Sequence, residues 1–414
     1  MLVGAISFSR NCLLNKTLVT TALEESWGTN HSISFLGDWC TLHSRKEIWS
    51  SRDYQIIPYH WRSSETFSSD YLYLRTVYET TLLDIATSLN KIHEVKHSLR
   101  YWRILIGPWV QYFVQILFDR WQMLEIASNQ TERFSTICLE IPHSWSIPQD
   151  FSQFLHFIET DIWNHTIYSQ LLRLKNEINL VNQPLINMLE LKSKFPSVHS
   201  NRTIKQGLTI GSIYNKFATR FSKESDSFFV GTMLPIADNL RLQIRLGQIP
   251  RLWNTDVEVE SKFNPEMRNW CLVSSGSDNF IRSLYSLIPM NIPLIYLEGY
   301  KKLESKIETL PWPSKPKIIF TSIQWSSHDV FKAWTATKVE TGSRLIIGQH
   351  GGAHGAARYM AIEEHQIEIS DLFLSWGWSG GEKVHPIGDL RCLKPNFPRR
   401  NGNRGIIINA AYPR

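Results

Sequence analysis

Hydrophobic and polar positions divide the chain into two parts with different periodicity. In residues 69–90 and again in 151–189, apolar side chains recur three or four positions apart, which predicts amphipathic helices. A β-branched run at 17–23 predicts a short buried strand, and aromatic and turn-forming residues at 35–61 predict loops with short helices. The first half is therefore predicted to be mainly helical.

The second half alternates short apolar runs with helical patterns. Strands are predicted at 227–233, 293–297, 318–322, 344–347, 369–376 and 405–409, and helices at 237–246 and 329–341. This alternation is typical of βαβ units, in which parallel strands form a sheet with helices on both of its faces. The sequence thus predicts an α/β protein with a mostly parallel sheet.

The last predicted strand lies close to the end of the chain. Residues 406–408 are all isoleucine, so the strand is expected to be buried on both faces, and only six residues follow the run. A parallel strand in that position needs a covering helix, and the sequence after it is too short to form one. We therefore expect the chain to be truncated just as a second βα domain begins.

Composition and charge exclude several classes of protein. Hydrophobic residues make up 43% and charged residues 20% of the 414 residues, which excludes a disordered or collagen-like chain. The net charge, 44 − 38 = +6, is too small for this length to indicate a nucleic-acid-binding stripe or a polybasic membrane anchor. The 16 tryptophans suit stacking on flat polar ligands such as sugars, although core packing explains many of them as well.

The cysteines and the apolar stretches indicate which cellular compartment to expect and whether a segment could span a membrane. The five cysteines are far apart, and none forms a CxxC pair. Neither a zinc site nor a disulfide framework is therefore expected, and a reducing cytosol is the natural compartment. The longest apolar stretch, 101–118, contains Arg103 and Pro108 and is too interrupted to span a membrane.

A glycine-rich loop follows the predicted strand at 344–347. Its sequence at 348–355, Gly-Gln-His-Gly-Gly-Ala-His-Gly, has four glycines, which permit close approach of the backbone to a ligand. Ligands collect at the carboxyl ends of parallel strands, so His350 is suited to act as a general base or to hold a phosphate. A tight turn with a locally bonded histidine explains the pattern equally well. Neither the P-loop nor the dinucleotide-binding fingerprint fits this loop.

Carboxylates cluster next to a second histidine, His365. Glu364 and Glu368 are four residues apart, and Asp371 follows at seven, so on a helix they share one face. Such carboxylates suit acid/base catalysis, whereas a solvated helix face is the ordinary alternative. Asp371 differs because it directly precedes an apolar strand. A carboxylate in that position more often has a structural or functional role than one on a solvated helix face.

Two further motifs mix aromatic residues with cations or glycine. Arg100 and Arg103 lie among aromatic residues and are suited to face an anionic substrate, or else belong to an amphipathic helix. The Trp-Gly-Trp motif at 376–378 is suited to stack on a ring or to fill a seam between domains.

Taken together, several motifs resemble one family. They are LVTTALEESW (18–27), LGDWC (36–40), YHW (59–61), SLRYWRILIGPWVQYF (98–113), LFDRW (117–121), FKAWTATKVETG (331–342), GQHGG..G (348–355) and ISDLFLSWGWS (369–379). The chain resembles the transferase family encoded in O-antigen and other surface-polysaccharide gene clusters, over nearly its whole length.

The resemblance implies a cytoplasmic glycosyltransferase of GT-B-like architecture, in which two Rossmann-like halves face each other across a substrate cleft. The site residues carried over from the family are Gln349, His350, Gly351, Gly352, Gly355, Glu364, His365 and Asp371. The family stretch reads like Glu-Asp-His-Glu, whereas here Gln366 stands in the last position, so the role of that carboxylate is in doubt.

The resemblance and the pattern together give the expected domains. Residues 1–395 are expected to form the amino-terminal half, with a helical insertion at 65–225 and βαβ units at 226–395. Residues 396–414 are expected to start a truncated second half. The expected fold is thus a Rossmann-like parallel sheet with a large helical insertion.

The expected function is transfer of a sugar, or a phosphorylated polyol, from a nucleotide-activated donor to a growing surface polysaccharide. His350 is the leading general base, which Asp371 or Glu364 would orient or assist by binding the acceptor. Arg100 and Arg103 would bind donor phosphates or an acidic acceptor sugar. The expected partners are the nucleotide sugar, as a substrate rather than a cofactor, and a glycan or lipid-linked acceptor. Peripheral association with the inner face of the membrane is an option.

Two other functions stay open at this point. One is a non-catalytic fragment or scaffold of the polysaccharide assembly machinery. The other is a metal-dependent hydrolase that uses His350, His354 and Glu364, although the HExxH spacing is absent and no metal is expected.

Overall fold

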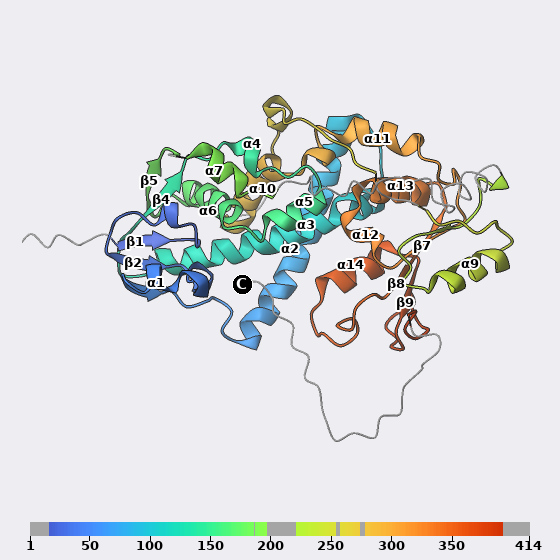
Figure 1. Cartoon of the computed structure of the whole chain (residues 1–414), viewed down its shortest axis with the longest axis horizontal. Helices are drawn as coiled ribbons and strands as arrows, with labels where there is room; N and C mark the ends of the chain where they lie inside the picture. Colours follow the sequence, from blue (N-terminus) through green and yellow to red (C-terminus); the bar gives the residue numbers. More distant parts are fainter. Residues whose placement is uncertain (1–15, 186, 197–220, 254–256, 274–277, 392–414) are drawn as a thin grey trace, which may run out of the picture.

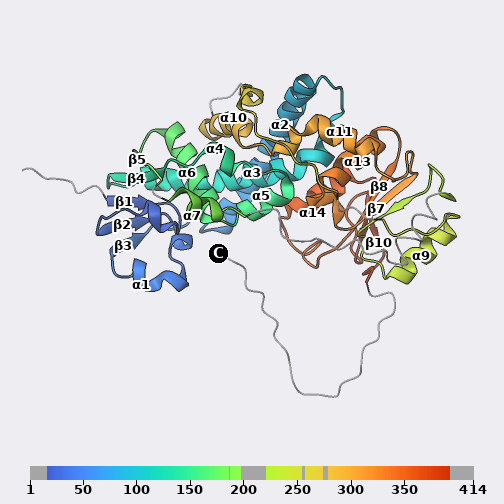
Figure 2. The same ribbon diagram turned by 45° about the horizontal axis from the view of Figure 1, so that its top comes forward.

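The β-strands form two separate parallel sheets, one toward each end of an elongated molecule (Figures 1 and 2). The computed structural model describes residues 16–185, 187–196, 221–253, 257–273 and 278–391. The fold is therefore α/β with Rossmann-like parallel sheets, as the alternation of strand and helix patterns predicted.

The first sheet has the order β3-β2-β1-β4-β5. Its strands are β1 (Lys16–Val19), β2 (Ser32–Phe35), β3 (Asp53–Ile56), β4 (Phe134–Leu139) and β5 (Asn179–Gln183). All neighbouring pairs are parallel, with Thr17 opposite Ile33 and Ser135. The strand order reverses direction between β1 and β4, which is the kind of switch point where doubly wound sheets bind ligands.

The second sheet has the order β10-β9-β8-β7-β6 and is also parallel throughout. Its strands are β6 (Phe228–Phe229), β7 (Ile318–Thr321), β8 (Arg344–Gly348), β9 (Leu372–Ser375) and β10 (Val384–Pro386). Phe228 and Ile319 join the main hydrophobic core, while Phe229 and Phe320 join a small cluster on the opposite face. Both faces are thus apolar, as expected for a parallel sheet.

Helices fill the space between the sheets and cover their faces. The α-helices are α1 (Lys46–Trp49), α2 (Ser64–His93), α3 (Leu99–Ser128), α4 (His143–Ser146), α5 (Phe151–Phe157), α6 (Asp161–Lys175), α7 (Met188–Ser193), α9 (Ile236–Arg245), α10 (Asn279–Asn291), α11 (Tyr300–Glu308), α12 (Gln324–Ser327), α13 (Asp329–Glu340) and α14 (Ala361–Ile369). Short 3₁₀ turns are η1 (Glu24–Ser26), η2 (Asp38–Cys40), η3 (His43–Arg45), η4 (Pro265–Arg268) and η5 (Leu294–Tyr296).

Helix α3 runs through the middle of the molecule and joins the two sheets into one core (Figures 1 and 2). It packs against α2, α5, α6, α10, α13 and α14. Its first turn is capped by the Ser98 hydroxyl, which accepts a hydrogen bond from the Tyr101 amide at 3.1 Å. Trp102 and Trp109 are fully buried, because this helix is apolar on most of its circumference. Among the helices of the described residues, none is both long and apolar enough to cross a membrane.

Several predicted elements differ from those observed. The predicted strand at 293–297 is instead the turn η5, because a short buried apolar run has the same pattern in either conformation. Leu294 and Ile295 donate backbone hydrogen bonds of 2.9 Å to Pro148 and Gln149, which links this turn to the segment after β4. The predicted helical stretch 151–189 is divided into α5, α6, β5 and α7.

The stretch 65–225, expected as a helical insertion, contains strands as well as helices. It supplies β4 and β5, which complete the first sheet. The loop-like segment 35–61 likewise contains β3, whose residues are mostly exposed and carry no apolar alternation. The boundary near 395 and the strand at 405–409 lie outside the described residues, so they stay predictions.

Candidate functional site

Two of the motifs that the sequence singled out lie at the carboxyl edge of the second sheet. The loops after its strands are residues 230–235, 322–323, 349–360, 376–383 and 387–391. They hold the glycine-rich loop and the Trp-Gly-Trp motif side by side, because β8 and β9 are neighbouring parallel strands. Parallel sheets bind ligands at this edge, since loops and backbone N–H groups are presented there.

Gln349 ties these two motifs together and is only 2% exposed. Its Nε2 donates to the Gly351 carbonyl at 2.7 Å. Its Oε1 accepts hydrogen bonds of 2.8 Å from the Trp376 amide and from Nε1 of Trp378. Gln349, a predicted ligand-binding residue, therefore uses both ends of its amide to hold this edge together.

The Trp378 ring lies over Gly355. A Cβ at Gly355 would lie 2.6 Å from three atoms of that ring, and its φ of +73° is in the left-handed region. Gly352 differs, because a Cβ there would meet no atom within 4 Å. The loop thus has one glycine required by the fold and another next to open space.

His350 lies in this loop beside two other aromatic side chains. Its ring centroid is 5.0 Å from that of His354 and 6.1 Å from that of Trp325. Burial and the neighbouring His354 lower the pKa of His350, although Gln366 acts in the opposite direction. Its Nδ1 is buried without a hydrogen-bond partner in the described part of the chain. A ligand that reaches this atom would satisfy it.

Gln366 lies on α14 at the position that departs from the Glu-Asp-His-Glu pattern, and its side chain is fully buried against the glycine-rich loop. Its Nε2 lies 2.9 Å from Nε2 of His354 and donates to the Ile362 carbonyl at 3.0 Å. The amide donor makes His354 Nε2 an acceptor, so the proton of this neutral ring is on Nδ1, which faces the Gly351 carbonyl at 3.1 Å. The amide therefore fixes the tautomer of His354.

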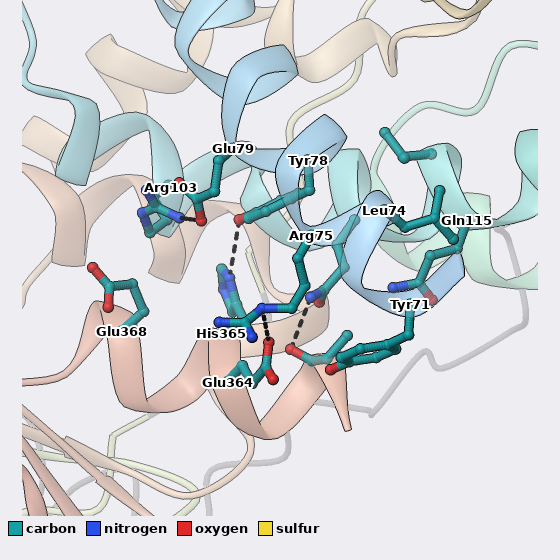
Figure 3. A pocket seen from close by; sticks show the side chains of 13 residues that line it. Tyr71, Leu74, Arg75, Tyr78, Glu79, Arg103, Gln115, Glu364, His365 and Glu368 are labelled. Atoms are coloured by element: carbon teal, nitrogen blue, oxygen red, sulfur yellow. Dashed lines mark hydrogen bonds and ion pairs between the residues drawn. The ribbon is translucent and has the colours of Figure 1, made fainter. Parts of the chain in front are cut away.

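A cavity of about 130 Å³ lies between α2, α3 and α14 (Figure 3). It is lined by Tyr71, Leu74, Arg75, Tyr78, Glu79, Arg103, Gln111, Val114, Gln115, Ala361, Glu364, His365 and Glu368. Its volume is roughly that of four waters at about 30 Å³ each. Three predicted site residues, Arg103, Glu364 and His365, meet in this cavity rather than in the glycine-rich loop.

Two ion pairs lie in this cavity. The Arg103 guanidinium donates to both oxygens of Glu79 at 2.6 and 2.7 Å, and Nε of Arg75 is 3.1 Å from Glu364 (Figure 3). The bidentate geometry is the strong form of this interaction, so Arg103 is held by the protein itself.

His365 is packed tightly between three helices. Burial, followed by the positive charges of Arg103 and Lys332, lowers the pKa of His365 to about 3, so the ring is neutral near pH 7. Its Nδ1 lies 3.4 Å from the Tyr78 hydroxyl, and a Cβ at Gly107 would lie 2.7 Å from its Cε1. Gly107 thus permits α3 to approach this ring.

Asp371 and Arg100 lie at the opposite edge of the second sheet from His350. Asp371 precedes β9, and its Oδ2 accepts a 2.8 Å hydrogen bond from the Leu345 amide at the start of β8. Its Oδ1 lies 2.9 Å from Nη2 of Arg100. The five residues of β8 separate the two edges by about 16 Å, at 3.3 Å per residue. Asp371 therefore cannot orient His350 directly, and it serves instead to join β8, β9 and α3.

The first sheet has a polar cluster that the sequence analysis did not single out. Nε2 of His60 lies 2.9 Å from Oδ1 of Asp119, and the same oxygen accepts a hydrogen bond from the Tyr59 hydroxyl. Arg120 forms an ion pair with Oδ2 of Asp119. The sequence contains both parts of this cluster as motifs, YHW at 59–61 and LFDRW at 117–121. Their contact depends on the tertiary fold, which the sequence pattern does not reveal.

Metal-ligating geometry is absent from the described ranges. Within residues 16–391, leaving out 186, 197–220, 254–256 and 274–277, no three His, Cys, Asp or Glu side chains lie together as metal ligands would. In the hydrolase alternative, Glu364 belongs to the cavity beside Arg75, while His354 bonds to Gln366.

Comparison with known proteins identifies a family over almost the whole chain. The model of the LIC12162 family transferase matches residues 16–411. No curated protein and no solved structure matched the chain.

Proposed function

The chain belongs to the LIC12162 family of transferases, and from this premise we propose that it is a glycosyltransferase of surface-polysaccharide synthesis. It would move a sugar, or a phosphorylated polyol, from a nucleotide-activated donor to a hydroxyl group of a glycan or lipid-linked acceptor. Such donors are made in the cytoplasm, which is the proposed compartment.

The observation that carries this proposal is the glycine-rich loop at the carboxyl edge of the second sheet. Gly351 and Gly352 lie in this loop, and Gly352 borders open space. A nucleotide donor needs backbone N–H groups and small side chains around its phosphates, and this edge of a parallel sheet offers both. We therefore place the donor phosphates beside His350, whose buried Nδ1 lacks a protein partner in the described residues.

His350 fits the donor side better than the role of general base. Its neighbours are Trp325, His354 and Gln366, and no carboxylate of the described residues is hydrogen-bonded to it. A histidine base gains from a carboxylate that orients the ring and stabilises the imidazolium. A neutral imidazole can instead donate one hydrogen bond to a phosphate oxygen.

A membrane contact of the same enzyme is proposed at α9. Ile236 and Ile244 are 65% and 61% exposed on this amphipathic helix, which also carries Arg241 and Arg245. Exposed apolar residues with basic neighbours fit the interface of an anionic lipid bilayer, where a lipid-linked acceptor would be located.

The test is donor binding to the purified chain, measured by thermal shift against UDP-, GDP-, dTDP- and CMP-activated sugars. We expect one donor class to raise the melting temperature of the wild type. Gly352→Val should fold normally, because its Cβ meets no atom within 4 Å, and yet should lose the shift. Ala353→Val, in the next and exposed position, is the matched control and should keep it.

Two results would contradict the proposal. Stabilisation by no donor of the panel would favour the non-catalytic scaffold. Equal stabilisation of the wild type and Gly352→Val would place the donor elsewhere on the molecule.

A further inference from the structure

We propose that His60, oriented by Asp119, takes the proton from the acceptor hydroxyl, so that the carboxyl edge of the first sheet binds the acceptor sugar. This inference rests on the proposed transfer reaction. The proton transfer is thus assigned to His60, in the loop after β3, and to Asp119 on α3. Both residues are far in sequence from the glycine-rich loop.

The first step of the argument is the charge state of Asp119. Three donors surround its carboxylate: Nε2 of His60 at 2.9 Å, the Tyr59 hydroxyl and the Arg120 guanidinium. Burial alone would raise the pKa of Asp119, but these hydrogen bonds and the charge of Arg120 together lower it. Asp119 is therefore an anion, and Asn164 holds Arg120 in place at 2.9 and 3.2 Å.

The second step is the tautomer of His60. Because Nε2 faces an anion, it carries a proton, and the lone pair of the neutral ring is on Nδ1. In the described part of the chain Nδ1 accepts no hydrogen bond, and it is not among the fully buried polar atoms that lack a partner. The His60 side chain is 5% exposed, so only this edge of the ring is left for an acceptor hydroxyl to reach. A histidine with one nitrogen on a carboxylate and the other unpaired has the arrangement of a general base.

The third step is the surroundings of the pair. His60 packs between Tyr59 and Trp61, with ring centroids 4.7 and 4.3 Å away. Tyr59 is 40% exposed and Phe67, which contacts Trp61 at 5.0 Å, is 36% exposed. Exposed aromatic rings beside a polar group suit a sugar ring, which has both apolar faces and hydroxyl edges.

The fourth step connects this edge with the donor side. Phe67 contacts Tyr359 with ring centroids 5.9 Å apart, and Tyr359 lies in the loop that begins with the glycine-rich segment. A row of rings, from His60 through Trp61 and Phe67 to Tyr359, thus joins the two carboxyl edges.

The proposed step balances as follows. The acceptor oxygen forms a bond to the anomeric carbon as its proton passes to Nδ1 of His60. The bond from that carbon to the donor phosphate breaks, and its electron pair leaves with the nucleotide. Asp119 stabilises the imidazolium without taking the proton, which is then released to water.

The test uses the full chain and the acceptor-dependent release of nucleotide. His60→Gln should lower kcat by about 10²- to 10⁴-fold. Asp119→Asn should lower kcat without raising the KM for the donor, and donor binding by thermal shift should stay at the wild-type level in both variants. His385→Gln, an exposed histidine on β10, is the matched control and should leave the kinetics unchanged.

Tyr59→Phe provides a milder variant in case His60→Gln does not fold. It keeps the ring but removes one donor from Asp119, so kcat should fall by less than in Asp119→Asn while donor binding stays at the wild-type level. A His60→Gln enzyme within threefold of the wild type, or an Asp119→Asn enzyme with wild-type kcat, would overturn the assignment while leaving the proposed transferase intact. A wild type that binds donors and transfers to no acceptor would overturn both.

Discussion

Replacing Gln349 by leucine tests whether this residue holds the candidate donor site together. Leucine has a similar volume but neither donates nor accepts a hydrogen bond. The change would leave the Gly351 carbonyl, the Trp376 amide and Nε1 of Trp378 without their present partners. Each buried group left unsatisfied costs about 1–3 kcal/mol. Because both tryptophans are partly exposed and water can reach some of these groups, we expect a total loss of roughly 2–4 kcal/mol.

The assay is urea unfolding followed by tryptophan fluorescence, with hydrogen exchange of residues 349–360 and 376–383. We expect a lower unfolding midpoint and faster exchange in both loops, because one side chain bridges them. Gln130→Leu is the control, since Gln130 is exposed and its side chain makes one local hydrogen bond to Ile126, so its effect should stay within about 0.5 kcal/mol. A Gln349→Leu protein with wild-type stability and exchange would refute the reasoning.

The remaining predictions concern packing, pH and the membrane. Gly107→Val should destabilise the protein by about 1–3 kcal/mol, measured by urea unfolding, because even its Cβ would lie 2.7 Å from His365. Burial and, next, the charge of Asp329 raise the pKa of Asp150 to about 6, so the folded state holds its proton more tightly than the unfolded state. Stability should therefore fall as the pH rises from about 4 to 6, and Asp150→Asn should remove that slope, with the Gln153 amide still capped. Ile244→Ser should reduce co-flotation with anionic vesicles, while unchanged flotation would exclude α9 as the contact.

The sequence predicted the fold class and four of the five strands of the second sheet, because strands buried on both faces are short continuous apolar runs. β7, β8 and α13 appear where the pattern placed them. β2, β4 and β10 were not predicted, and neither were β3 and β5, whose exposed edge positions carry polar residues and no clear alternation. The turn η5 was mistaken for a strand, because periodicity does not distinguish the two in a short buried run.

For the candidate site, the sequence located the motifs but did not predict which side chains they contact in the folded protein. The glycine-rich loop and the Trp-Gly-Trp motif lie at one sheet edge, as expected of residues that follow parallel strands. Asp371 was grouped with Glu364 and Glu368 because a helical spacing was extended past residue 369, where α14 ends. The contact of His60 with Asp119 spans 59 positions and depends on how α3 packs, which periodicity does not reveal.

The structure separates core tryptophans from those near the two sheet edges. Trp27, Trp102, Trp109, Trp163 and Trp334 are almost completely buried, so core packing accounts for them. Trp39, Trp61, Trp376 and Trp378 are partly exposed after strands of the two sheets, where they are available for stacking on a ligand.

The most direct test of the account is nucleotide release by the wild-type chain from a nucleotide-sugar panel, with and without a lipid-linked glycan acceptor. We predict that one donor class is consumed, that release depends on the acceptor, and that the sugar is recovered covalently on the acceptor. Release at the same rate without acceptor, with no sugar on the glycan, or no release from any donor, would contradict the claim that this protein is a glycosyltransferase.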